Sequence, residues 1–92
     1  MAKSIITQIS EFCFLCGRRA TEVHHIYGGA NRGLSEKYGL TVPLCHACHN
    51  EPPHGAHHNK ETADMLKAIG QVRFEQEYPN LDFREIFGKN YR

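Results

Sequence analysis

Four cysteines in two CxxC pairs constrain this chain more than any other feature. The pairs are "CFLC" and "CHAC", with Cys13 and Cys16 in the first and Cys45 and Cys48 in the second. A chain of 92 residues buries a core near the lower limit for independent folding, and such chains are commonly stapled by disulfides or a metal. Four thiolates match the tetrahedral preference of a closed zinc site. We therefore predict a structural Zn²⁺ held by all four cysteines.

The N-terminal residues and the net charge indicate where the protein is located and how it could contact nucleic acid. The first ten residues lack the apolar core and cleavage site of a signal peptide, and no apolar run approaches a membrane span. These features predict a cytoplasmic protein without a membrane partner, in which thiols stay reduced and bind zinc. The formal net charge of +1 is low for a protein that holds nucleic acid by electrostatics alone. Any DNA contact would then be local, through bound metal or through Lys3, Arg18, Arg19, Arg32 and Lys37.

Two adjacent histidines lie in "TEVHHI", a β-rich stretch that predicts a strand over Thr21–Ile26. Neighbouring side chains on a strand point to opposite faces, so His24 and His25 cannot readily chelate one ion. One imidazole can bind a metal while the other remains free to move protons. A base beside a metal-bound phosphate suits hydrolysis of a phosphodiester.

Five of the seven histidines fall in "LCHACHNEPPHGAHHN", residues 44–59. His49 directly follows Cys48, where a zinc site would hold the backbone in place for a second metal. With His24 and His57 it would make a three-imidazole site, whose remaining positions stay open to water or phosphate. His58 and then His54 are the alternatives to His57 as the last ligand.

The motifs "CFLC…VHHI…VPLCHACHN…H" resemble the HNH endonucleases of the ββα-metal class in their zinc-stapled variant, over about residues 13–60. The resemblance extends to small bacteriophage HNH proteins, including nucleases associated with recombination. It implies that His24 is a metal ligand, His25 the general base and His49 the first ligand after the second strand. Leu40 stands where the family commonly has an asparagine, and Asn31 and Asn50 are the candidates to replace it.

The expected fold is α+β, with a small ββα-metal (HNH, or His-Me finger) core stapled by the four-cysteine zinc site and a C-terminal helical extension. One domain would cover residues 1–92. Its parts would be an N-terminal arm or strand in 1–12, the zinc knuckle and metal core in 13–58, and helices in 59–88.

Local patterns predict the remaining elements. The four glycines of Tyr27–Gly39 predict a mobile loop, and "LTVPLC" predicts a second strand over Leu40–Cys45. Asn59 can cap a long helix that ends near Tyr78, before Pro79. A shorter helix would follow over Leu81–Gly88. The apolar face of the long helix is expected to consist of Ala63, Met65, Leu66, Ile69, Val72 and Phe74.

The resemblance implies a metal-dependent endonuclease that hydrolyses DNA phosphodiester bonds with Mg²⁺, Mn²⁺ or Zn²⁺ at the histidine site. DNA would be its partner, a recombination or replication protein a further candidate, and the active form a monomer or a dimer. Two alternatives remain open: a zinc-stapled DNA-binding module without catalysis, and a zinc-stabilised protein-interaction domain. His25 distinguishes the endonuclease from both alternatives, because neither alternative needs a general base.

Overall fold

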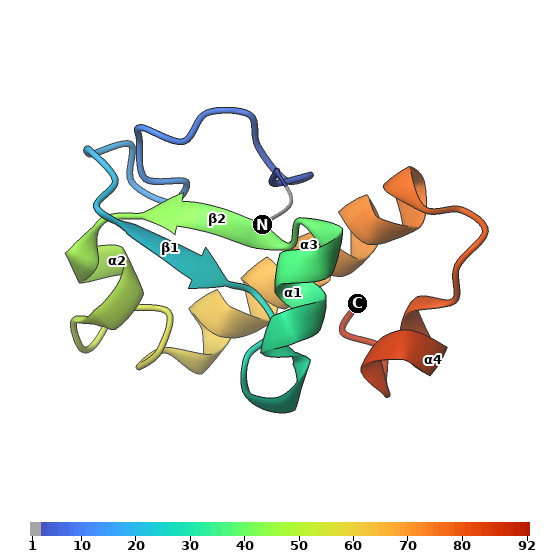
Figure 1. The fold of residues 1–92 in the computed structure, drawn as a ribbon. Coiled ribbons are helices and arrows are strands. Elements are labelled where there is room, and N and C mark those ends of the chain that lie inside the picture. The colour runs from blue at the N-terminus through green and yellow to red at the C-terminus, as the bar shows by residue number, and fades with distance from the viewer. Residues whose placement is uncertain (1–2) are drawn as a thin grey trace.

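A two-stranded antiparallel sheet and a long helix organise the protein in the computed structural model, which describes residues 3–92 (Figure 1). Strand β1 (Glu22–His25) pairs with β2 (Thr41–Leu44). In this register His24 lies opposite Val42 and Val23 opposite Pro43. The predicted α+β class is confirmed, and both strands fall within the segments that the sequence predicted.

The helices follow the strands in a simple order. A 3-10 turn η1 (Gly29–Asn31) and helix α1 (Arg32–Tyr38) connect the two strands, and α2 (His46–Asn50) begins directly after β2. The long α3 (Lys60–Glu77) passes beside the sheet, and α4 (Phe83–Phe87) packs against it near the C-terminus (Figure 1). Within the described residues, no helix is long and apolar enough to cross a membrane.

The prediction of a mobile loop over Tyr27–Gly39 was wrong, because this segment forms η1 and α1. Its glycines lie mostly at the ends of these elements, and Gly39 closes α1 in the left-handed conformation at φ 72°. The buried Ser35 joins α1 to the residue after β1: its hydroxyl donates to the Tyr27 carbonyl at 2.8 Å and accepts from the Tyr27 amide at 3.0 Å. This tertiary contact cannot be predicted from the number of glycines in the segment.

Helix α3 begins as the sequence predicted, but it buries a different face. The Asn59 side chain accepts a hydrogen bond from the Thr62 amide at 3.0 Å, so the predicted cap is confirmed. Leu66 and Phe74 are buried as expected, whereas Met65 and Val72 are 45% and 39% exposed. The other buried positions of α3 are Gly70 and Gln71.

Close packing against Tyr27 explains the difference. A Cβ atom at Gly70 would lie 2.8 Å from the Tyr27 hydroxyl, so the glycine allows this close approach. The same hydroxyl donates to the Lys67 carbonyl at 2.5 Å. Tyr27 is only 1% exposed and packs its ring against Phe83, Phe87 and Tyr91. Its contacts, rather than the longest apolar stripe, therefore orient α3.

The N-terminal segment is an arm rather than a strand. An arm or a strand was predicted for residues 1–12, and the described residues 3–12 contain no strand, so they form the arm. The Ile5 amide donates to the Gly39 carbonyl at 2.9 Å, and the Ser4 hydroxyl donates to the Thr41 carbonyl at 2.6 Å. Residues 1–2 of the predicted arm lie outside the described residues.

Gly39→Ala should lower the free energy of unfolding by about 1–3 kcal/mol, because φ is positive and the new Cβ would meet the Lys3 carbonyl oxygen. Gly33→Ala is the matched control. It lies inside α1 with nothing within 4 Å of a new Cβ, and should stabilise the protein by up to about 1 kcal/mol. Urea denaturation of the zinc-containing proteins measures both. Equal effects of the two substitutions would contradict the packing described for Gly39.

Candidate functional site

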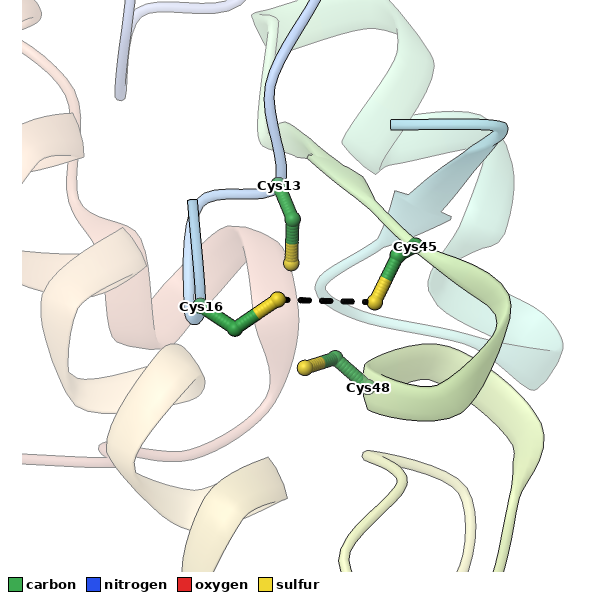
Figure 2. A group of neighbouring side chains, drawn as sticks. All are labelled: Cys13, Cys16, Cys45 and Cys48. Carbon is green, nitrogen blue, oxygen red and sulfur yellow. Dashed lines mark hydrogen bonds between the residues drawn. The ribbon is translucent and has the colours of Figure 1, made fainter. Parts of the chain in front are cut away.

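The four cysteines form one cluster (Figure 2). Their sulfur atoms lie 3.6–3.9 Å apart, and Cys16 Sγ is 3.6 Å from Cys45 Sγ. A tetrahedral zinc with Zn–S bonds of about 2.3 Å separates its sulfurs by roughly 3.8 Å. All four cysteines are free rather than disulfide-bonded. The cluster therefore can hold a metal ion and has the dimensions of a structural zinc site.

Local backbone geometry presents these thiols to one another. In the knuckle, Gly17 takes a positive φ of 80° and its amide donates to the Cys13 carbonyl at 3.0 Å. On the other side, Cys45 is the N-cap residue of α2 and Cys48 lies within that helix. The cluster thus connects residues 13–16 to the start of α2.

The electrostatics of the cysteine cluster favour a bound cation. Burial raises the pKa of the Cys13 thiol, but hydrogen bonds from the backbone at Cys45, Cys16 and Leu15 outweigh it and lower the pKa to about 6. Burial and the neighbouring thiols raise the pKa of Cys48 far above its usual value. A thiolate is thus stabilised at Cys13 and disfavoured at Cys48. A metal ion bound by the cluster would favour the thiolate form of all four cysteines, Cys48 included.

Three histidines from separate segments converge into a second cluster. His24 comes from β1, His49 from α2 and His57 from the turns before α3, and one ring nitrogen of each lies within 4.8 Å of the others. The Nε2 atoms of His49 and His57 are 2.9 Å apart. Two nitrogens on one zinc at about 2.0–2.1 Å lie roughly 2.8–3.4 Å apart, depending on the bond angle. The spacing of this pair therefore suits two ligands of one ion.

His24 is the buried member of this histidine cluster. It is 5% exposed, and its Nδ1 atom has no hydrogen-bond partner within residues 3–92. Burial, with smaller effects from the charges of His49 and His57, lowers the pKa of His24 to about 4. Burial and His49 also lower the pKa of His57. His24 is therefore neutral at pH 7 and keeps a lone pair, which a metal ligand requires.

The carboxylate of Glu22 forms a hydrogen bond with His49, a contact that was not predicted from the sequence. Glu22 Oε1 lies 2.6 Å from His49 Nδ1, and Oε2 lies 2.7 Å from His46 Nδ1. Hydrogen bonds from these two imidazoles lower the pKa of Glu22. An ionised Glu22 accepts the Nδ1 proton of His49 and so leaves a lone pair on Nε2, the atom that faces His57. The alternation of β1 could have revealed it, since residues 22 and 24 share one face.

His25 points away from the histidine cluster and meets α1. Its Nε2 atom lies 3.0 Å from Glu36 Oε1. A carboxylate accepts the proton of Nε2, so the lone pair of the neutral ring is on Nδ1. No residue in 3–92 hydrogen-bonds to that Nδ1. Glu36 was missed because its helix was predicted to be a loop.

The other predicted site residues lie elsewhere. Leu40 is fully buried in the core. The Asn31 amide donates to the Phe87 carbonyl at 3.3 Å, and the Asn50 amide donates to Glu22 Oε1 at 3.3 Å. Neither amide is hydrogen-bonded to His25, and Asn31 shares only the lining of one cavity with it. The alternative ligands His54 and His58 are exposed and fall outside the histidine cluster.

A cavity of about 260 Å³ lies beside both histidines of β1. His24 and His57 line it together with His25, and Lys67 of α3 and Tyr91 of the C-terminal tail complete its wall. A larger groove of about 940 Å³ lies between the N-terminal arm and the strands, and no histidine lines it. The smaller cavity is therefore the candidate active site.

Comparisons of this chain with protein-family models, with curated proteins and with solved structures give no match. The chemistry of the site consequently rests on its own geometry.

Replacing one ligand in each cluster should remove one metal ion and leave the other. Cys48→Ser should lose the zinc of the cysteine cluster and lower the melting temperature, since a structural metal contributes directly to folding. His49→Ala should retain that zinc and lose only the ion of the histidine cluster. Native mass spectrometry of both variants counts the ions. Full metal content in Cys48→Ser would show that the thiols do not hold zinc.

Glu22→Gln should weaken metal binding at the histidine cluster by about 10–100-fold, because His49 loses the carboxylate that fixes its tautomer. Glu51→Gln is the matched control: Glu51 Oε2 lies 3.8 Å from His46 Nε2, as an exposed pair, and does not contact His49. Calorimetric titration with Mn²⁺ measures both affinities. Equal affinity of Glu22→Gln and the wild type would exclude this supporting contact.

Proposed function

We propose that this chain is a metal-dependent endonuclease of the HNH type that hydrolyses phosphodiester bonds in DNA. One observation carries the proposal: neighbouring histidines of β1 face different partners beside one cavity. His24 turns toward His49 and His57, whereas His25 turns toward Glu36. This arrangement keeps a general base separate from the metal ligands and yet next to them.

The different proposed roles of His24 and His25 follow from the alternation of side chains along β1, which points them to opposite faces. His24 is buried and neutral, which suits a ligand and not a proton carrier at neutral pH. His25 is half-buried and keeps Nδ1 unpaired, so a water can approach that atom. Glu36 stabilises the imidazolium that forms once the ring has accepted a proton.

In the proposed reaction, His25 activates a water molecule that cleaves one phosphodiester bond. Nδ1 of His25 takes one proton from a water, and the water oxygen forms a bond to phosphorus. One P–O ester bond breaks, and the departing oxygen takes a proton from solvent water. The proton that His25 then releases neutralises the hydroxide left by that water. The products are one phosphate monoester and one hydroxyl. A divalent ion held by His24, His49 and His57 would supply the positive charge that stabilises the departing oxygen.

The zinc of the cysteine cluster has only a structural part in this proposal. Four cysteines leave no open position for water or substrate, whereas three histidines do. The two strands with the turns and helix α3 that follow would form the ββα-metal unit. We propose that the enzyme works in the cytoplasm on DNA, as a monomer or a dimer, and that a recombination or replication protein recruits it.

A catalytically inactive zinc-stapled DNA-binding or recruitment module is the second candidate. Leu40 favours it, because a buried leucine stands where the family commonly has an orienting asparagine. The pairing of His25 with Glu36 weighs against it, since that contact orients a base that a binding module does not use.

Purified protein should nick supercoiled plasmid with Mg²⁺ or Mn²⁺ and not with excess EDTA. His25→Ala should reduce the rate by about 10²–10⁴-fold, which is the usual contribution of a general base, and should keep both metal ions. His58→Ala is the control, because His58 is an exposed neighbour of a ligand and lies outside the histidine cluster. Equal nicking by folded His25→Ala and the wild type would refute the role of His25. Absence of metal-dependent nicking in the wild type would refute the nuclease.

A further inference from the structure

We propose that Lys67 of α3 is the phosphate-binding residue of the candidate active site and holds the DNA backbone at the histidine cluster. This inference rests on the proposed function, because it names how the substrate of that site is held. It concerns a residue to which the sequence analysis assigned no part.

The position of Lys67 points toward the reacting groups. Its side chain is half-buried and lines the same cavity as His24, His25 and His57. Lys67 is the only lysine or arginine in the lining of this cavity, and no carboxylate belongs to that lining. A lysine in a cavity lined without carboxylates favours an anionic ligand such as a backbone phosphate.

Lys67 has no anionic partner of its own within the described part of the chain. Ion pairs at up to 4.0 Å include Lys60 with Asp64 at 2.6 Å on the same helix, but none with Lys67. Its Nζ atom instead lies 5.4 Å from the centre of the Tyr91 ring. The nearby Asp64 feels the charge of Lys67, which contributes to lowering the pKa of Asp64, but the carboxylate of Asp64 is paired with Lys60. A half-buried ammonium without a direct ion pair gains more from an incoming phosphate than a paired one does.

The C-terminal tail keeps Tyr91 in this place. The Tyr91 amide donates to Gln71 Oε1 at 2.6 Å, and Gln71 Nε2 donates to Asn90 Oδ1 at 2.9 Å. Gln71 is only 1% exposed, so its side-chain amide needs partners within the protein, and the C-terminal tail provides a donor and an acceptor. The Tyr91 ring also packs 5.2 Å from the Tyr27 ring. The tail is therefore a fixed wall of the cavity against which the stem and ammonium of Lys67 rest.

Lys89 provides a matched control. Its Nζ atom lies 5.0 Å from the centre of the same Tyr91 ring, so both lysines make a cation–π contact with Tyr91. Lys89 does not line the cavity. Replacing either lysine by methionine removes one charge and one contact with Tyr91, and only the Lys67 change removes a cation from the cavity.

The test measures binding of a short fluorescent DNA duplex by anisotropy, without added divalent metal, over a range of NaCl concentrations. Lys67→Met should weaken binding by about tenfold and lower the slope of log K against log salt by roughly 0.9, the value of one lost phosphate contact. Lys89→Met should bind within about twofold of the wild type with an unchanged slope. Lys67→Arg keeps the charge and should restore most of the binding.

Other results would overturn the proposal. Unchanged binding in Lys67→Met would exclude Lys67, as would equal losses in Lys67→Met and Lys89→Met, which would indicate a general charge effect. Absence of DNA binding by the wild type would exclude it as well. If Lys67→Met fails to fold, failure of the folded Lys67→Arg to bind more tightly than a folded neutral Lys67→Gln overturns it instead.

Failure of the nuclease and failure of the phosphate contact can be told apart, because the binding assay needs no cleavage. Selective loss of binding in Lys67→Met, with no nicking by the wild type, would support the phosphate site and refute the enzyme. Nicking by the wild type with normal binding and nicking by Lys67→Met would support the enzyme and refute the role of Lys67.

Discussion

Cys45 and Cys48 belong both to the cysteine cluster and to the start of α2. The position of the cysteine cluster therefore also sets the position of α2 and of His49. The sulfur atoms of residues 13 and 16 lie 3.6–3.9 Å from those at the start of α2, so a metal ion at the cluster would cross-link the two segments. His49 follows Cys48 by one residue, so whatever fixes the thiols also fixes the backbone of His49. Small chains commonly need a metal or disulfide of this kind in addition to their core.

The pairing of β1 with β2 gives His24 and His25 different surroundings. A strand directs successive side chains to opposite faces, so His24 is buried on one face and His25 reaches α1 on the other. Burial keeps His24 neutral, and the carboxylates of Glu22 and Glu36 select the proton positions on His49 and His25. Each imidazole is thereby oriented by a neighbour from another segment, which is how protein sites usually set histidine tautomers.

The end of helix α1 places Leu40 in the core. Leu40 follows the C-cap residue Gly39 and is fully buried. Its amide donates to the Ser35 carbonyl at 2.8 Å, and its carbonyl accepts from the Ile26 amide at 3.0 Å. A polar side chain at this position would be costly to bury. The hydrogen bond to His25 comes from Glu36, which lies on α1 four residues before Leu40.

The sequence by itself determined the two strands, the cap of α3 at Asn59 and the grouping of the four cysteines, because each depends on local spacing or backbone preference. It also singled out His24, His49 and His57, which the tertiary structure brings together. Only the tertiary structure decided which face α3 buries, since Tyr27 contacts Gly70 and Lys67 across a long sequence separation. It likewise decided that Glu22, Glu36 and Lys67 belong to the site. These residues are ordinary surface charges in the sequence, and they acquire their partners when segments that are distant along the chain pack together.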